Sequence, residues 1–438
     1  MYRICTFLVV SCLASSLAIG QTGSSDSLQF RGNGGTGVVD SRDFPEAWGT
    51  DSNIAWASDL KGGGLSSPVV VGDRIFLTTA IGFGEPASFM QGVSDMRPKL
   101  PGGALKFQVM CLKLNDGSMV WEKTIAEQKP QHPIHASNSF ATESPASDGK
   151  NLFVYFAAIG KLAGMDLDGN VIWEKDLGSY PTGNGFGTGS SITVGDGRVY
   201  VQCDNDQSSF VSAYDSKTGD EVWKKPRTGR TSWATPLFWK NDLRSELVAC
   251  GSGTVTSYNP ADGEELWSLS NIGMSFSASP AIDSERIYFG NSGPRSSGPL
   301  IAISAGMNGK VAFAANAKME NLAWSKMQAG PGMSSPVSIG GYVYVVGKSK
   351  LTCYSAKDGT EVYKTRIPLG SMAASLWAAG DRVFAMDENG KAIAIEVGPE
   401  MKVSSTNQIN NDLFWSTPAM AGNSLLIRGN KKLYCIRK

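Results

Sequence analysis

The sequence predicts an all-β protein: an eight-bladed β-propeller of four-stranded antiparallel blades, whose ring is closed by an N-terminal strand. Two recurring phrases and the two ends of the chain indicate this fold. The first phrase is a glycine followed four residues later by an aromatic residue. Its copies are Gly117 to Trp121, Gly169 to Trp173, Gly219 to Trp223, Gly263 to Trp267 and Gly359 to Tyr363. Units that recur about every 50 residues indicate a repeat architecture.

The second phrase opens each unit with a small or polar pair, which a proline follows in six of the eight copies. A short strand, a turn with Gly or Asp and a second strand rich in β-branched and aromatic residues come next. Proline is tolerated at the start of a strand because no ladder donor is needed there. The pairs are Ser66-Ser67, Glu143-Ser144, Gly189-Ser190, Ala234-Thr235, Ala278-Ser279, Ser334-Ser335, Ala374-Ser375 and Ser416-Thr417. Four strands per unit, repeated eight times, predict a propeller whose blades stack on one another.

The ends of the chain fit this arrangement. The eighth unit runs from Trp415 to Ile436 and stops after its third strand. A strand with the missing tryptophan, Trp56, occurs at residues 53–59, before any first strand. We infer that this segment completes the last blade, which would remove an exposed sheet edge.

The N-terminus predicts export. We interpret residues 1–20 as a signal peptide, with Arg3 as its positive region and Ala18-Ile19-Gly20 as the cleavage site. A lipoprotein signal at Cys12 is the alternative. Residues 21–50 form a glycine-rich arm and residues 51–438 the propeller. No other stretch could span a membrane, so we expect the mature chain in the periplasm or at the outer-membrane periphery.

The composition argues against nucleic-acid binding and against a disulfide-stabilised fold. The chain of 438 residues has 40 acidic and 40 basic residues and no basic stripe, so nucleic acid is not an expected partner. Five cysteines remain after residue 20, an odd count at wide spacing that argues against a disulfide framework. Cys111, Cys353 and Cys435 occupy the third-strand position that Ala213 and Ser257 fill in other units. We expect free thiols that fill space as small hydrophobes.

Unit three carries a family resemblance. It reads Ala213-Tyr214-Asp215-Ser216-Lys217-Thr218-Gly219-Asp220-Glu221-Val222-Trp223. This resembles A-x-D-x-x-T-G-x-x-x-W, the tryptophan-docking repeat of pyrroloquinoline quinone (PQQ) propellers, a family that includes quinoprotein alcohol dehydrogenases and BamB. Residues 29–32, 53–56 and 65–68 also resemble exported PQQ-like propellers of planctomycetes. The resemblance implies that aromatic rings dock between blades, here Trp56, Trp121, Trp173, Trp223, Trp267, Trp324 and Tyr363.

The resemblance does not extend to quinoprotein chemistry. A working quinoprotein of this family has a vicinal cysteine disulfide, a calcium site of carboxylate and amide oxygens, and a catalytic aspartate; no residues here match them. We therefore expect no cofactor. We favour a non-enzymatic binding or scaffold protein of the cell envelope, BamB-like in outer-membrane protein assembly, with envelope or outer-membrane proteins as partners. The alternatives are a PQQ-dependent, dehydrogenase-like enzyme and a small-ligand sensor.

Three other motifs predict no catalytic or metal site. Residues 32–37 fit G-x-G-x-x-G but lack the strand and helix that a dinucleotide fingerprint needs. Residues 204–206, Asp-Asn-Asp, lack the glycine and distant glutamate of an EF-hand and are expected to be a solvated turn. His132 and His135 share a loop with no third ligand in view, so they support neither a metal site nor a catalytic triad.

One residue breaks the repeat. Two positions before the opening proline or its equivalent, the units carry Ser66, Glu143, Gly189, Ala234, Ala278, Ser334, Ala374 and Ser416. Because innermost strands line the central channel of a propeller, Glu143 would place a carboxylate there. It is a candidate ligand contact together with His135, Asn138, Arg230 and Trp233. The alternative is a glutamate bonded to backbone amides.

The first unit also carries a long insertion, at about residues 82–106, with methionines and aromatics among glycines. Long loops in compact domains are often functional. The insertion is either a partner-binding loop or a loop folded over its own propeller.

Overall fold

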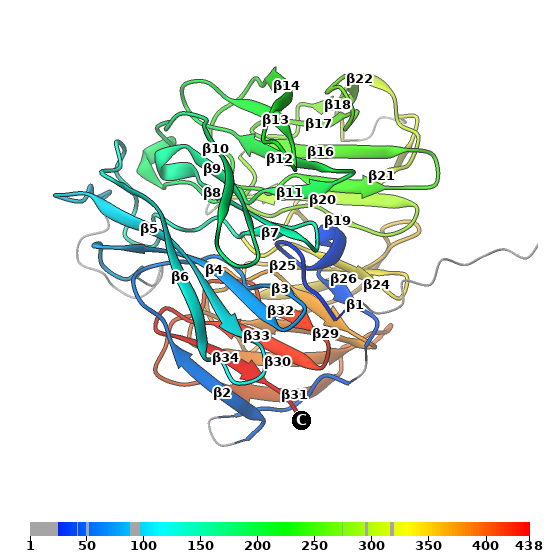
Figure 1. Cartoon of the computed structure of the whole chain (residues 1–438). Coiled ribbons are helices and arrows are strands. Elements are labelled where there is room, and N and C mark those ends of the chain that lie inside the picture. The colour runs from blue at the N-terminus through cyan, green and yellow to red at the C-terminus, as the bar shows by residue number, and fades with distance from the viewer. Residues whose placement is uncertain are drawn as a thin grey trace, which may run out of the picture.

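Eight radial sheets are arranged around a central axis in the computed structural model, which describes residues 25–41, 43–49, 52–87, 97–273, 275–293, 297–315 and 319–438. The chain passes once around the ring, so the blue strand β2 lies beside the red C-terminal strands (Figure 1). The predicted all-β, eight-bladed fold is confirmed. The proposed signal peptide and the middle of the first-unit insertion lie outside the described residues.

Each blade is built from consecutive strands, with the innermost strand first. Blades 1 to 4 comprise β3 (Val69–Val71), β4 (Arg74–Ile81), β5 (Leu105–Lys113) and β6 (Met119–Gln128); β7 (Ala146–Ser147), β8 (Asn151–Phe156), β9 (Lys161–Asp166) and β10 (Val171–Asp176); β11 (Thr193–Gly195), β12 (Arg198–Cys203), β13 (Phe210–Asp215) and β14 (Glu221–Pro226); and β15 (Leu237–Lys240), β16 (Ser245–Gly251), β17 (Thr254–Tyr258) and β18 (Glu265–Ser270).

The second half of the ring repeats this order. Blades 5 to 8 comprise β19 (Ala281–Ile282), β20 (Arg286–Ser292), β21 (Ser297–Ser304) and β23 (Leu322–Lys326); β24 (Val337–Ile339), β25 (Tyr342–Gly347), β26 (Lys350–Ser355) and β27 (Glu361–Arg366); β28 (Trp377–Ala379), β29 (Arg382–Met386), β30 (Lys391–Glu396) and β31 (Val403–Gln408); and β32 (Ala419–Ala421), β33 (Ser424–Arg428), β34 (Lys432–Ile436) and β2 (Ile54–Asp59). Helical structure in the described residues is confined to three 3-10 turns: η1 (Asn33–Gly35), η2 (Ala157–Ile159) and η3 (Gly183–Gly185).

The ring is closed by the N-terminal strand, as predicted. β2 pairs antiparallel with β34, with Trp56 opposite Cys435 and Asp59 opposite Lys432. The last blade thus takes its outermost strand from residues almost four hundred positions earlier in the chain. Two blades gain a fifth, parallel strand: β1 (Val38–Val39) joins β28, and β22 (Gly309–Ala312) joins β18.

The aromatic residue of the repeat lies opposite a small residue on the neighbouring strand. The pairs are Cys111 with Trp121, Gly164 with Trp173, Ala213 with Trp223, Ser257 with Trp267, Ala302 with Trp324, Cys353 with Tyr363, and Cys435 with Trp56. Cys111, Cys353 and Cys435 are free and fully buried. The expectation that these thiols fill space is confirmed.

Five tryptophans dock onto the next blade in the same way. The ring lies against the glycine of the following Gly-to-Trp turn, and the indole N–H donates to a carbonyl beside that turn. The bonds run from Trp56 to Leu114, Trp121 to Leu167, Trp173 to Ser216, Trp223 to Pro260 and Trp324 to Ala356, at 2.9–3.1 Å. A Cβ at the facing glycine, for example Gly219, would meet the ring at 2.5 Å.

Trp267 and Tyr363 lie in different surroundings. Trp267 donates to Glu246 Oε2 of its own blade at 2.7 Å, and β22 covers it because the blade 5 connection runs along the edge of β18. The buried Tyr363 hydroxyl has no aligned hydrogen bond among the described residues. These two positions share the sequence phrase without the inter-blade indole bond.

The N-terminal arm, residues 25–39, runs across the innermost strands and covers one end of the channel. Ser27 exchanges two backbone bonds with Val70 of blade 1, and Gly37 O accepts from Ala378 of blade 7. Between them the arm contacts blades 2 to 6 through Ser147, Val194, Leu237, Pro280 and Pro336. Gly35 has a φ of 68° and lies so close to Leu237 that a Cβ would come within 2.8 Å. The glycines therefore let the arm lie close against the blades.

Candidate functional site

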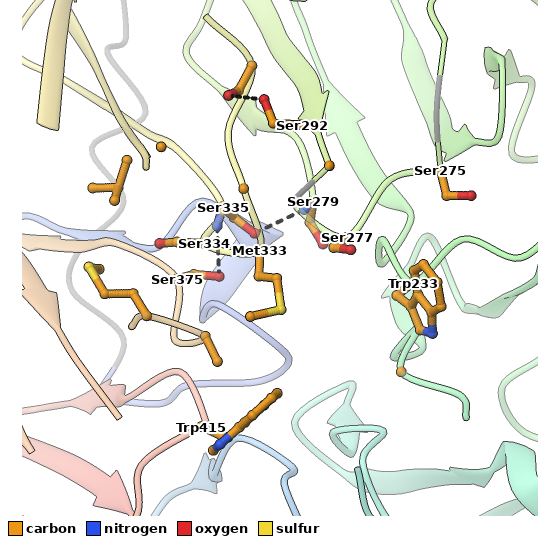
Figure 2. Close-up of a pocket in the computed structure, with 18 of the residues that line it drawn as sticks. Trp233, Ser275, Ser277, Ser279, Ser292, Met333, Ser334, Ser335, Ser375 and Trp415 are labelled. Carbon is orange, nitrogen blue, oxygen red and sulfur yellow. Dashed lines mark hydrogen bonds between the residues drawn. The ribbon is translucent and has the colours of Figure 1, made fainter. Parts of the chain in front are cut away.

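A cavity of about 1660 Å³ occupies the centre of the propeller. It is lined mainly by the segments that enter the innermost strands of all eight blades, and Phe30 of the arm also lines it. The blades, the entering segments and the arm thus together form one central site, part of which is drawn in Figure 2.

A ring of eight hydroxyls lines this cavity. We call it the hydroxyl ring: Ser67, Ser144, Ser191, Thr235, Ser279, Ser335, Ser375 and Thr417. Each comes directly before the opening proline, or before Ile192 in blade 3 and Leu376 in blade 7. In blade 3 the position that matches Glu143 is therefore Ser190, and the sequence-based assignment of Gly189 is wrong by one residue. Seven of the eight side-chain oxygens accept a backbone N–H from the preceding member, as in Ser279 to Ser335 at 2.9 Å and Ser335 to Ser375 at 3.3 Å (Figure 2). The ring therefore links neighbouring blades around the axis.

These hydrogen bonds determine whether the hydroxyls can still donate or accept a hydrogen bond to a ligand. A hydroxyl has one proton to donate besides its acceptor lone pairs. In the ring the oxygens act as acceptors, and no ring hydroxyl donates to another described residue. The protons are thus available to an acceptor in the cavity. Ser334, which is 2% exposed and also lines the cavity, has no hydrogen-bond partner for its hydroxyl among the described residues.

Cations outnumber carboxylates in the described lining. Asp206 is the one acidic residue there, and Thr231 already donates two hydrogen bonds to its Oδ1, at 2.9 and 3.1 Å. The lining also contains four basic residues: Arg230, Lys348, Lys350 and Lys364. None of the four has an ion pair to a described residue. The cavity therefore carries net positive charge near neutral pH.

A further cation lies behind the ring. Arg31 of the arm is 4% exposed and donates to the carbonyls of Pro280, at 2.8 Å, and Pro336. Those prolines directly follow Ser279 and Ser335 of the hydroxyl ring. Burial lowers the pKa of the Arg31 guanidinium to about 9, so it stays charged near neutral pH. No described carboxylate pairs with it, and its Nε has no hydrogen-bond partner.

The walls of the cavity are partly apolar. Trp233 and Trp415 enter before blades 4 and 8, on opposite sides of the ring, and Met333 lies near the hydroxyls of blade 6 (Figure 2). The Trp233 indole donates to Gly187 O at 2.7 Å, whereas the Trp415 indole N–H has no partner among the described residues. The arrangement offers aromatic surface, hydroxyl donors and positive charge within one space.

The structure divides the candidate ligand residues into two groups. Asn138, Arg230 and Trp233 line the cavity, whereas Glu143 and His135 do not. Asn138 joins two loops by donating to Phe186 O and Thr188 O at 2.6 and 3.0 Å. His135 is 8% exposed, bonds to Ser137 Oγ through Nδ1 at 2.7 Å, and has a pKa that burial lowers.

Glu143 is buried and does not line the central cavity. It is 1% exposed, and neither carboxylate oxygen has an aligned hydrogen bond to a described residue. The backbone-amide bonds considered from the sequence are therefore not formed with good geometry. Burial raises the pKa of Glu143 to about 7, a shift that the nearby Thr188 hydroxyl reduces. Around neutral pH the side chain is partly protonated.

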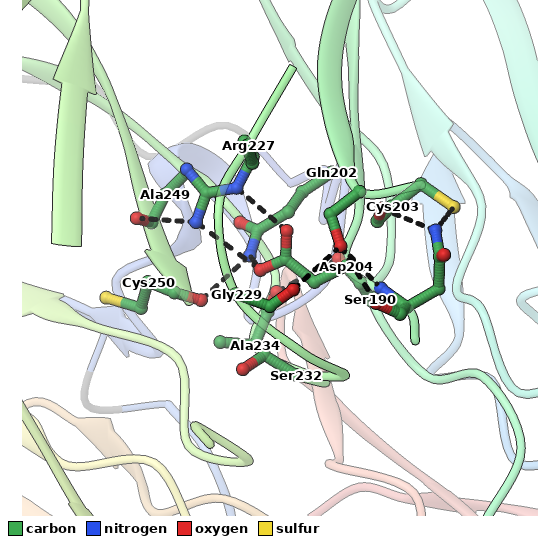
Figure 3. Close-up of polar contacts among 12 residues, drawn as sticks. Ser190, Gln202, Cys203, Asp204, Arg227, Gly229, Ser232, Ala234, Ala249 and Cys250 are labelled. Atoms are coloured by element: carbon green, nitrogen blue, oxygen red, sulfur yellow. Dashed lines mark hydrogen bonds and ion pairs between the residues drawn. The ribbon is translucent and has the colours of Figure 1, made fainter. Parts of the chain in front are cut away.

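The Asp-Asn-Asp segment is not a solvated turn, contrary to the expectation from the sequence. Asp204 and Asn205 are buried, and only Asp206 is exposed. Asp204 Oδ1 lies 2.8 Å from Arg227 Nε, both side chains being 3% exposed (Figure 3). Gln202 adds a bond of 2.8 Å to Asp204 Oδ2. The carboxylate can be buried because an arginine that directly follows β14 of the same blade compensates its charge.

The described residues contain no group of three or more His, Cys, Asp and Glu side chains that could hold a metal ion. His132 Nε2 lies 3.3 Å from Ser179 O, in a loop contact. The sequence analysis missed the hydroxyl ring, although its signal, a Ser or Thr directly before each opening proline or its equivalent, was visible in every unit.

The family follows from a comparison with known proteins. The family model described as "Outer membrane protein assembly factor BamB" matches residues 33–185, 105–335 and 307–399. The chain belongs to this BamB family. BamB of Yersinia pestis is 21% identical over 259 residues, which cover 54% of this chain and 61% of the relative. BamB of Bordetella pertussis is 27% identical over 192 residues, or 43% of this chain and 44% of the relative. The chain thus spans about three fifths or less of the length of these curated relatives.

Solved structures agree on the fold. BamB from Moraxella catarrhalis superposes with a TM-score of 0.55 at 12% identity, over 84% of this chain and all of that chain. Quinohemoprotein alcohol dehydrogenase from Comamonas testosteroni superposes with a TM-score of 0.62 at 11% identity, over 94% of this chain and 80% of that chain. No helix in the described part of the chain is long and apolar enough to cross a membrane.

The quinoprotein likeness raises the question of whether PQQ would fit. The quinoprotein pattern requires a vicinal cysteine pair and several oxygen ligands for a metal. The described cavity lining has no cysteine and one carboxylate, Asp206, which Thr231 already holds. The residues present therefore do not fit that cofactor, and its chemistry contributes no step to the function.

Proposed function

We propose that this protein is a non-enzymatic, exported scaffold of the cell envelope with a BamB-like part in outer-membrane protein assembly. Membership of the BamB family, matched from residue 33 to residue 399, is the observation that carries the proposal. Envelope or outer-membrane proteins are the proposed partners. The proposed location is the periplasm or the outer-membrane periphery, reached by cleavage after residue 20.

The make-up of the cavity supports binding over catalysis. General acid–base and nucleophilic catalysis need a titratable group positioned beside a reacting atom. The lining lysines and Tyr354 are titratable, but no hydroxyl of the ring is hydrogen-bonded to a described histidine or carboxylate that could act as its base.

Two measurements test this proposal, one on the purified mature protein and one in intact cells. With PQQ and calcium added, we expect neither quinone absorbance retained after gel filtration nor dye-linked oxidation of alcohols. Cross-linking in intact cells should join the protein to outer-membrane proteins or their assembly machinery. Alcohol oxidation that depends on added PQQ would overturn the proposal in favour of a quinoprotein enzyme.

A further inference from the structure

We propose that the central cavity is a binding site for a small organic anion, whose carboxylate or phosphate group is held by the hydroxyl ring. The inference concerns a ligand of this chain and goes beyond the scaffold function, which could stand or fall separately. Three features of the described residues lead to it: convergent hydroxyl donors, uncompensated positive charge, and aromatic walls.

The first feature is the supply of donors. Eight hydroxyls at one level line the cavity, and the oxygens of seven are occupied as acceptors of backbone N–H groups. A ligand oxygen that only accepts hydrogen bonds could bind the O–H donors that these hydroxyls leave unused. Carboxylate and phosphate oxygens are such acceptors, and hydrogen bonds to charged groups are stronger than those to neutral groups.

The second feature is an unpartnered buried group beside the ring. Ser334 is 2% exposed, lines the cavity and has no hydrogen-bond partner among the described residues. Leaving a buried polar group unpaired costs free energy. In Figure 2, Ser334 lies beside Ser335 and Ser375 of the ring. A ligand acceptor here would satisfy a group that the protein itself leaves unpaired.

The third feature is charge. Arg31 holds a buried positive charge behind Ser279 and Ser335, without a described carboxylate partner. Lys348 and Lys350, at the turn between β25 and β26, add exposed cations to the lining. A cleft lined by one sign of charge attracts a ligand of the opposite sign. This charge selects an anion over a neutral hydroxyl acceptor such as a sugar.

The walls suggest what the anionic group is attached to. Trp233, Trp415 and Met333 supply apolar surface on several sides of the cavity (Figure 2). Ligand sites combine apolar walls with a few polar groups that fix orientation. An anion with an aromatic or aliphatic body fits this combination better than a bare inorganic ion does.

Calorimetric titration of the full mature protein tests the proposal with three probes of similar shape: phenyl phosphate, benzoate and benzyl alcohol. We expect saturable binding of at least one anion and none of the neutral alcohol, and the stronger anion identifies the preferred group. High salt should weaken the binding. Absence of binding by both anions, or equal binding of the alcohol, would overturn the proposal.

Two single variants test whether the anion binds beside the hydroxyl ring. Ser334→Ala removes a hydroxyl that makes no bond to a described residue, so we expect normal folding and about tenfold weaker binding of the preferred anion. Ser212→Ala is the matched control, because its hydroxyl is also buried and unpartnered but does not line the cavity. Equal affinities of these two variants would contradict the assignment.

A double variant of two exposed lysines tests the electrostatic contribution without changing buried residues. Lys348→Gln with Lys350→Gln changes only exposed side chains, and we expect severalfold weaker binding with a reduced salt dependence. The exposed Lys150, in a turn of blade 2, provides the control Lys150→Gln. An unchanged salt dependence in the double variant would refute the electrostatic part of the proposal.

Discussion

A single added methyl group can test how the blades hold together. Gly219 has a φ of 72° and faces the ring of Trp173, so a Cβ there would lie 2.5 Å from the indole. Gly197 has the same φ of 72°, but a Cβ there would meet nothing within 4 Å. The variants Gly219→Ala and Gly197→Ala therefore share the backbone effect and differ in contact with the tryptophan.

The magnitude follows from these two contributions. Holding an alanine in the left-handed region costs about 1–2 kcal/mol at either position. Overpacking against a fixed ring adds about 1–3 kcal/mol at Gly219 alone. Trp173 is held in place because it is 8% exposed and donates to Ser216 O at 3.0 Å. We expect Gly219→Ala to lose about 2–5 kcal/mol of unfolding free energy and Gly197→Ala about 1–2 kcal/mol.

Urea unfolding followed by circular dichroism measures both losses, with an unchanged m-value as the sign that only stability has changed. A double variant sharpens the test. Trp173→Ala should cost about 3–5 kcal/mol alone, and adding Gly219→Ala to it should cost only the backbone contribution. Equal losses in Gly197→Ala and Gly219→Ala, or strictly additive losses with Trp173→Ala, would refute the docking argument.

Three further predictions concern closure, ionisation and a buried ion pair. Deletion through Asp59 removes β2 and should lower the melting temperature more than deletion through Ser52, which removes the arm and the buried Phe44 and Trp48 but keeps β2; equal melting temperatures would argue against ring closure. Because burial raises the pKa of Glu143 from 4.5 to about 7, its ionisation should reduce stability progressively as pH rises across that interval. Glu143→Gln should then be more stable than the parent by up to about 3 kcal/mol near pH 8 and no more stable near pH 4, and parallel stability–pH curves would contradict this. Asp204→Ala leaves Arg227 buried without its carboxylate and should cost about 3–5 kcal/mol in urea unfolding, whereas a loss below 1 kcal/mol would show that the pair is not buried in solution.

The repeat made most of the fold predictable. The eight opening pairs indicated the number of blades, and a missing strand at one end of the chain matched an extra strand at the other. Trp56 could therefore be assigned to the last blade from the sequence. Trp267 could not be distinguished from the docking tryptophans, because its surroundings depend on β22, which is inserted into the next unit.

The site was harder to predict because the position of Glu143 behaves differently from blade to blade. Its counterparts Ser334 and Ser416 line the cavity, whereas Glu143 does not. Glu143 stands out in the sequence, but the hydroxyl ring is formed by the residue that follows it in each unit. The bonds that join the ring run between blades, and no single unit reveals them.

The Asp204–Arg227 pair illustrates a second limit. Asp-Asn-Asp has the composition of an exposed turn, and local sequence gives no sign of burial. Arg227 lies 23 residues further along, just after β14, and comes to Asp204 only when the blade forms. Gln202 and the Cys250 carbonyl complete the surroundings (Figure 3). Burial of such charges depends on tertiary pairing and cannot be inferred from a short motif.

We propose that this BamB-family propeller is a scaffold in outer-membrane protein assembly. The most direct measurement is the amount of folded outer-membrane β-barrel protein, by heat-modifiability gels, in the source bacterium with its gene deleted and then restored. We predict that deletion lowers this amount and that the intact gene restores it. An unchanged amount of folded barrel protein in the deletion strain would contradict the claim.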